Sequence, residues 1–230
     1  MQPSSFDLQV LRWFAPLQNR PFWVDTGDTL SNDALFNGVV YALPLFLLWR
    51  CSGAKERRIS QQRLLTIMLA TGVGIAVSIL LQQIIRWPPP SVYPPVRDFY
   101  TWHSPPNENP NSFPSDSAML FSIVAMGTAA WSRRLSAGLF AWLVIFVAPA
   151  RLFVGGHYPT DILAGILVGS MSLLLSKALV KSMGVFEKLA ASDSPALQAA
   201  IFFWLFEVGT EFRELNGLLR ATLHISSHHL

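Results

Sequence analysis

Three residues that could do chemistry together, Arg151, His157 and Asp161, lie where an irregular segment meets a long apolar stretch. Their spacing is R-x5-H-x3-D. Pro159 suits the first turn of a helix, because the N–H that proline lacks is not needed there. We therefore expect a helix to begin near Tyr158 and His157 to lie at its mouth.

These side chains suit the handling of a phosphate group. Asp161 lies about one helical turn beyond His157 and can accept the proton on one imidazole nitrogen, which leaves the other nitrogen free to attack. Gly155 and Gly156 let the backbone approach a tetrahedral group, while the helix N-terminus and the Arg151 guanidinium both favour an anion. A histidine and an aspartate at this spacing also occur as ordinary helix-end residues, but the arginine and the glycine pair favour a phosphate site.

A second segment, Phe113-Pro-Ser-Asp-Ser-Ala118, also directly precedes an apolar stretch. Together the two segments resemble the type 2 phosphatidic acid phosphatase (PAP2) superfamily, which includes lipid phosphate phosphatases, bacterial undecaprenyl-diphosphate phosphatases and vanadium haloperoxidases. The family pattern is K-x6-R-P, P-S-G-H and S-R-x5-H-x3-D. The resemblance covers roughly residues 60–180, with Ala150 at the usual serine of the third motif and Asp116 as in the P-S-D-H variant of the undecaprenyl-diphosphate phosphatases.

The resemblance implies a mechanism and a set of site residues. His157 would attack phosphorus to form a phosphohistidine, Asp161 would orient it, and Arg151 would hold phosphoryl oxygens. The expected phosphate-binding residues are Ser115, Arg86, Asp116, Ser117, Gly156 and Arg97. No cofactor and no metal are implied.

Two departures from the family pattern affect the expected chemistry. Ser117 stands where the family has the histidine that protonates the leaving group, and a hydroxyl is far too weak an acid to replace an imidazolium. His103, in the loop that precedes this segment, is the residue that could take the place of the missing acid histidine. The first motif is degenerate: Arg86 is the best candidate for its phosphate ligand and Arg97 the second, although cations also collect at membrane helix ends as interfacial anchors.

Composition indicates an integral membrane protein. The chain is 51% hydrophobic and 13% charged, with a mean hydropathy of +0.37, whereas ordinary soluble domains have about 25% charged residues. We expect one domain over residues 1–230, with a core at 60–180, an N-terminal interfacial segment at 1–32 and a C-terminal amphipathic helix and tail at 190–230. The net charge of +3 suits membrane topology and lipid headgroups, and does not suggest nucleic-acid binding.

Apolar stretches predict an all-α helical bundle with five transmembrane helices and amphipathic terminal helices; a sixth crossing by the C-terminal helix stays open. The stretches are roughly 34–50, 63–86, 115–132, 136–154 and 159–180. Lys and Arg crowd the first and third loops and the segment after the last stretch, which should be cytoplasmic. Both motifs then fall on the extracytoplasmic side.

The 87–114 loop is rich in proline, so we expect it to be non-helical and to form a stiff cap over the site. Its aromatic residues, including Trp87 and Tyr100, suit a membrane-interface belt better than substrate stacking. Residues 5–18 have the apolar spacing of a helix that lies on a membrane surface.

The expected function is a phosphatase in a bacterial inner membrane, acting on a lipid phosphate among membrane lipids. An isoprenoid diphosphate such as undecaprenyl diphosphate is favoured, because a departing phosphate needs less protonation than a departing alkoxide. The alternatives are a lipid-diphosphate-dependent phosphotransferase and a non-catalytic lipid-phosphate-binding relative. The oligomeric state is not predicted.

Overall fold

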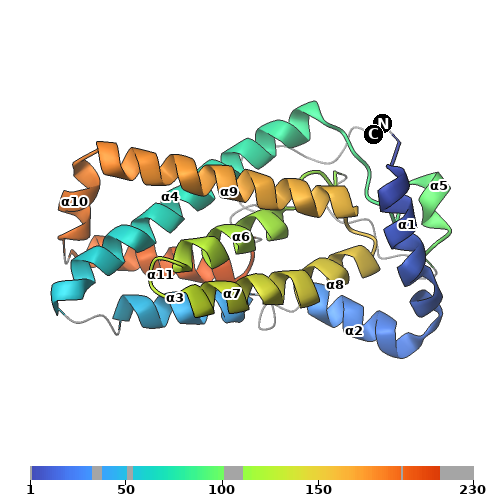
Figure 1. Ribbon diagram of the computed structural model, residues 1–230, viewed down its shortest axis with the longest axis horizontal. Helices are drawn as coiled ribbons and strands as arrows, with labels where there is room; N and C mark the ends of the chain where they lie inside the picture. The colour runs from blue at the N-terminus through green and yellow to red at the C-terminus, as the bar shows by residue number, and fades with distance from the viewer. Residues whose placement is uncertain (1, 33–37, 51–53, 101–110, 193, 213–230) are drawn as a thin grey trace.

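The computed structural model describes residues 2–32, 38–50, 54–100, 111–192 and 194–212, and these residues form helices and no strands (Figure 1). The expected all-α fold class is confirmed. The helices are α1 Ser5–Phe14, η1 Ala15–Asn19, α2 Pro21–Asn32, α3 Val40–Arg50, α4 Ala54–Ile84, α5 Pro94–Arg97, α6 Asp116–Thr128, α7 Arg133–Trp142, η3 Leu143–Val147, α8 Ala148–Phe153, α9 Pro159–Ser182, α10 Val185–Ala190 and α11 Pro195–Gly209.

Three of the described helical segments are long and apolar enough to cross a bilayer. They are Glu56–Ile84 in α4, the continuous α7–η3–α8 segment Arg133–Phe153, and α9. The count of five or six crossings is not confirmed, because α3, α6 and α11 have only 11, 13 and 15 residues against the roughly 20 that a crossing needs. The molecule is a helical membrane protein that combines long helices with shorter apolar ones.

The short helix α6 lies inside the bundle and is buried along nearly its whole length. Glycines on α9 allow the two helices to approach closely: a Cβ at Gly165 would lie 2.4 Å from the carbonyl oxygen of Ser115, and one at Gly169 would lie 2.7 Å from that of Met119. The Ser115 N–H also donates to the carbonyl of Asp161 at 3.1 Å. This packing brings the second and third motifs together.

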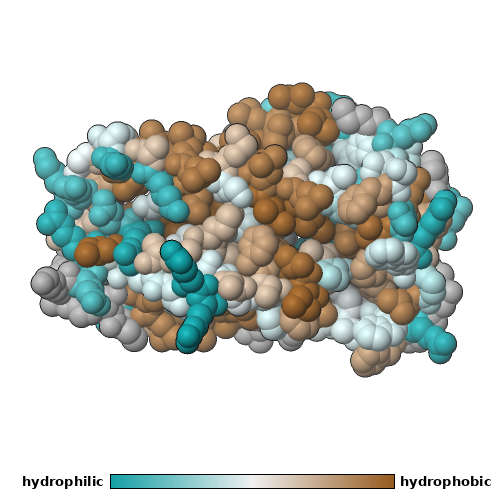
Figure 2. All heavy atoms as spheres, viewed as in Figure 1, coloured by the Kyte–Doolittle hydropathy of each residue, from teal (hydrophilic) through white to brown (hydrophobic). Residues whose placement is uncertain are grey.

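The motifs and the basic loops lie at opposite ends of the long axis. Figure 1 shows the start of α4 and α10 at one end, and α1, α5 and the start of α9 at the other. Arg57 and Arg58 are exposed at the start of α4, and Lys181 is exposed at the end of α9. On the face in Figure 2, hydrophobic residues gather over the middle and hydrophilic residues at both ends, as in a protein whose middle lies in lipid.

The N-terminal helix α1 lies across the end of the bundle that carries the motifs, where it contacts α8 and α9. Its Asp7 is buried. The Asp7 carboxylate accepts one hydrogen bond from the Thr160 N–H at 3.0 Å and another from the Thr160 hydroxyl at 3.2 Å. Trp13 on the same helix remains 70% exposed, and the contact of α1 with a membrane surface stays a prediction. The helix thus caps the first turn of α9.

The described part of the 87–114 loop corrects two expectations. It contains one helical turn, α5, because Pro94 and Pro95 occupy the first positions of that turn, where proline is tolerated. Trp87 and Tyr100 are buried in the protein instead of facing lipid. The Tyr100 hydroxyl donates to the carbonyl of Leu152 at 3.2 Å, so this segment packs onto the chain beside the third motif.

Candidate active site

His157 lies in the turn between α8 and α9, where the sequence predicted a helix mouth. Its Nδ1 is 2.7 Å from the carbonyl oxygen of Ser112. Because a carbonyl can only accept, Nδ1 carries the proton and Nε2 holds the free lone pair. The imidazole is therefore held in the tautomer that a nucleophile needs.

The surroundings of His157 favour its neutral form. Burial lowers the pKa of His157 to about 4, and the positive charge of Arg151 acts in the same direction, while the hydrogen bond to Ser112 opposes them. A neutral imidazole at physiological pH keeps the Nε2 lone pair available.

Ser112 is itself held by the segment that follows α4. Its N–H donates to the Trp87 carbonyl at 2.7 Å, and its hydroxyl donates to the same oxygen at 3.1 Å. The neighbouring Asn111 side chain donates to the carbonyls of Gln82 and Ile85 at 2.8 and 2.6 Å. The carbonyl that orients His157 is thus fixed by a network that sequence reasoning did not find.

Asp161 makes a different contact from the one expected. It makes no hydrogen bond to His157; its Oδ2 accepts from the Tyr158 N–H at 2.8 Å, in a capping box at the start of α9. The physical reason is that an acidic side chain at the third helical position can reach back to an unpaired N–H of the first turn. In this structure, Ser112 takes the orienting position that the sequence suggested for Asp161.

The two glycines before His157 serve the turn. Gly155 has φ of +70°, and a Cβ there would lie 2.9 Å from the Ser91 side chain and 3.1 Å from the Tyr100 ring. The space beside Gly155 is therefore filled by protein, where a ligand had been expected. Gly156 is half-buried next to it and remains the candidate for approach to a phosphate.

The second motif forms the start of α6. The Ser115 hydroxyl, fully buried, accepts from the Ala118 N–H at 3.5 Å and caps the helix. Asp116 is exposed and accepts hydrogen bonds from Ser78 and Gln82 of α4. Ser115 lies beside the third motif, whereas the Asp116 side chain is directed to α4.

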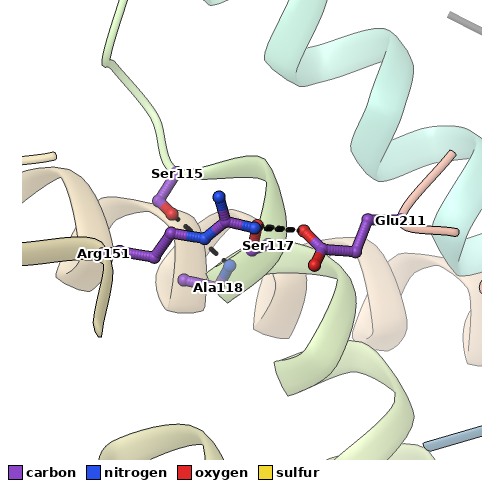
Figure 3. A network of polar contacts seen from close by, with 5 residues as sticks. All are labelled: Ser115, Ser117, Ala118, Arg151 and Glu211. Carbon is purple, nitrogen blue, oxygen red and sulfur yellow. Dashed lines mark hydrogen bonds and ion pairs between the residues drawn. The ribbon is translucent and has the colours of Figure 1, made fainter. Parts of the chain in front are cut away.

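Ser117, Arg151 and Glu211 form a polar network between three elements (Figure 3). The Glu211 Oε2 accepts from the Arg151 Nη2 at 2.5 Å and from the Ser117 hydroxyl at 2.6 Å. The side chains of Arg151 and Glu211 are only 12% and 7% exposed. Arg151 is at the end of α8 and Ser117 in the first turn of α6, so the structure joins the second and third motifs through a carboxylate.

Glu211 is the site residue that sequence reasoning missed. It follows the apolar helix α11, and the sequence showed it only as one of several acidic residues in the C-terminal amphipathic segment. No motif spacing connects it to Arg151, which is 60 residues away in the chain. The one signal was a pair of acidic residues, Glu207 and Glu211, at the end of a strongly apolar stretch.

The remaining candidates lie apart from this network. Arg86 is exposed after the end of α4, and Arg97 is exposed and pairs with its neighbour Asp98 at 3.8 Å. Neither guanidinium makes a hydrogen bond to Ser115 or Ser117. His103 lies outside the described residues.

Comparison with known proteins identifies the family. The family model of the PAP2 superfamily matches residues 63–183, slightly more than half of the chain. The chain is also 28% identical over 115 residues to the Escherichia coli (strain K12) protein named "Putative undecaprenyl-diphosphatase YbjG", over 49% of this chain and 58% of that protein. This chain therefore covers less than two thirds of that relative's length. No solved structure matches the chain. The matched region contains both motifs and the turn that carries His157, and the chain belongs to the PAP2 superfamily.

Proposed function

We propose that this protein is a membrane lipid phosphatase that hydrolyses an isoprenoid diphosphate, such as undecaprenyl diphosphate, through a phosphohistidine at His157. The observation that carries the proposal is the state of His157: a neutral imidazole with Nδ1 on the Ser112 carbonyl and the charge of Arg151 nearby. A nucleophile with its lone pair held free next to a buried cation is suited to attack an anionic phosphoryl group.

In the first step, Nε2 attacks the terminal phosphorus and the bridging P–O bond breaks. The lipid monophosphate leaves with the bonding electron pair. In the second step, water attacks the phosphohistidine, the P–N bond breaks, and the electron pair returns to the imidazole. Arg151 offsets the charge on the phosphoryl oxygens in both steps, and Ser115 supports the α6 end of the site.

The diphosphate is favoured over a monophosphate because of Ser117. A monophosphate releases an alkoxide, which needs a good acid, and a serine hydroxyl cannot serve as one. A diphosphate releases a phosphate, which is stable near neutral pH. The name of the Escherichia coli relative, "Putative undecaprenyl-diphosphatase YbjG", points to the same substrate class.

The test is an assay of phosphate release by the purified full-length protein over matched lipid mono- and diphosphates, with His157→Ala as the blank. We expect release from the diphosphate to be at least about a hundredfold faster, the lower end of what a positioned acid contributes to a reaction that needs one. Equal rates, or faster release from the monophosphate, would contradict the diphosphate assignment. Failure to release phosphate from any substrate would favour the non-catalytic alternative.

We also propose that the site faces the extracytoplasmic side of a bacterial inner membrane, because the basic residues at the other end follow the positive-inside rule. A cysteine at Arg97, in a background without Cys51, should react with an impermeant thiol reagent added to intact cells. A cysteine at Arg57 should not react until the membrane is opened. The reverse labelling pattern would overturn the orientation.

A further inference from the structure

The Glu211 carboxylate occupies a position built for an anion. Its Oε2 takes one N–H of the buried Arg151 and the hydroxyl of Ser117, which are the donors that a phosphoryl oxygen would use (Figure 3). Arg151 has further donor capacity at the same place, because its Nε is buried without a hydrogen-bond partner among the described residues. The guanidinium binds only one oxygen of Glu211, and it has a further N–H for a second oxygen of a phosphate.

An uncommon turn delivers Glu211 to this position. After α11 ends at Gly209, Glu211 and Phe212 have φ of 56° and 58°, a left-handed conformation that residues with a Cβ rarely adopt. Phe212 donates its N–H to the Glu207 carbonyl at 2.7 Å, and its ring is buried. The turn thus depends on tertiary contacts, among them the ion pair with Arg151, and not on local preference.

We propose that Glu211 is an internal competitor of the substrate, a carboxylate that a phosphate must displace from Arg151 and Ser117. Two anions cannot share the same N–H and O–H donors, and a phosphate beside an undisplaced carboxylate would be repelled. The apparent affinity of any phosphate is therefore lowered by the cost of opening the ion pair.

This cost lowers the affinity of every phosphate by the same factor. A lipid phosphate also gains binding energy from its chain in the membrane, so it stays bound despite the cost. Inorganic phosphate has only its contacts with the donors of the site, so the same factor leaves it almost unbound. If the proposed hydrolysis occurs, inorganic phosphate is its second product, and the carboxylate would help to expel it.

Orthovanadate, a small tetrahedral anion, tests the proposal without any turnover. Its affinity would be measured by calorimetry on the purified full-length protein for wild type, Glu211→Gln and Glu207→Gln. Glutamine keeps the shape of residue 211 and removes its charge, so we expect Glu211→Gln to bind vanadate at least about tenfold more tightly, about 1.4 kcal/mol. Glu207→Gln, which neutralises a buried carboxylate in α11 four residues before Glu211, should bind as wild type does.

Equal or weaker vanadate binding by folded Glu211→Gln would overturn the proposal. So would an equal gain in Glu207→Gln, since the effect would then be one of general charge. Because vanadate binding does not depend on hydrolysis, a positive result stands even if no lipid phosphate is turned over, and the proposed function can fail separately.

A second measurement keeps Glu211 in place and covers the case in which Glu211→Gln does not fold. Thr210, half-buried beside Glu211, would be replaced by cysteine in a Cys51→Ser background. Displacement of the carboxylate should move the turn, so saturating vanadate should raise the rate at which Thr210→Cys reacts with a thiol reagent several-fold. An unchanged or reduced rate at saturation would contradict displacement.

Discussion

Two turns bring titratable side chains to Arg151, and they differ in how the chain encodes them. The turn before α9 is local: glycine, histidine, proline and aspartate follow one another within seven residues, and each has a role in the bend or the cap. The turn after α11 has no such pattern, and Glu211 is held there by hydrogen bonds from Arg151 and Ser117, which are distant in the sequence. In the function that we propose, the first turn carries the nucleophile and the second carries a carboxylate that occupies the position of an anion, so the recognisable motif covers only half of the proposed arrangement.

The largest effect should come from the first turn. His157→Ala removes the nucleophile, and we expect turnover of a lipid diphosphate to fall by about 10³-fold or more. The fold should survive, because the hydrogen bond to the Ser112 carbonyl is the only one that the His157 side chain makes with the described residues. Thermal unfolding of the variant is the control, and residual activity above a few per cent would rule out a phosphohistidine here.

The neutral state of His157 gives a pH prediction. Its pKa is lowered to about 4, so the reactive form persists as pH falls and is lost only near that value. The acid limb of kcat/KM should therefore bend near pH 4, below the ordinary value of about 6.5, with a tenfold fall per pH unit beneath it. The same difference makes the fold lose stability as pH drops from 6.5 toward 4, since the unfolded chain then binds the proton more readily. An acid limb near 6.5 would show that the imidazole is solvated in the working enzyme.

Asp161 and Glu211 show most clearly what could and could not be predicted from the sequence. Residues close in sequence were placed well: the start of α9 and the amphipathic helix α1 follow from local preferences. The contacts that decide the chemistry are long-range, and spacing does not reveal them. Asp161 could equally cap its helix or hold an imidazole at the same spacing, and only the position of Ser112, 45 residues before His157, decides between these roles.

The number of membrane crossings also could not be predicted from hydropathy alone. Hydropathy predicted one of five crossings at 115–132, but α6 has 13 residues and is buried along nearly its whole length, so this crossing is not confirmed. A hydropathy pattern does not separate a residue that faces lipid from one that faces another helix.

Substitutions of Asp161 test whether this residue of the first turn caps α9 or orients His157. If it serves the cap, Asp161→Asn should reduce activity less than about tenfold, because the amide oxygen can still accept from the Tyr158 N–H. Asp161→Ala should cost about 0.5–2 kcal/mol of stability, as the loss of a helix cap does. Steady-state kinetics and thermal unfolding of both variants would be compared. A loss near that of His157→Ala in the asparagine variant would instead place the carboxylate on the imidazole during the reaction.

The smallest effect should come from Asp7, which supports the nucleophile turn from outside. Asp7→Ala leaves the Thr160 N–H and hydroxyl without their acceptor, and hydrogen bonds to a charged group contribute about 1.5–3 kcal/mol. We expect unfolding to be easier by that amount and turnover to fall only a few-fold, because α9 keeps its own cap at Asp161. Asp25→Ala, on an exposed position of α2, is the matched control. A large loss of kcat with unchanged stability would mean that α1 orders the catalytic turn directly, so the local motif too would depend on a distant segment, as Glu211 does.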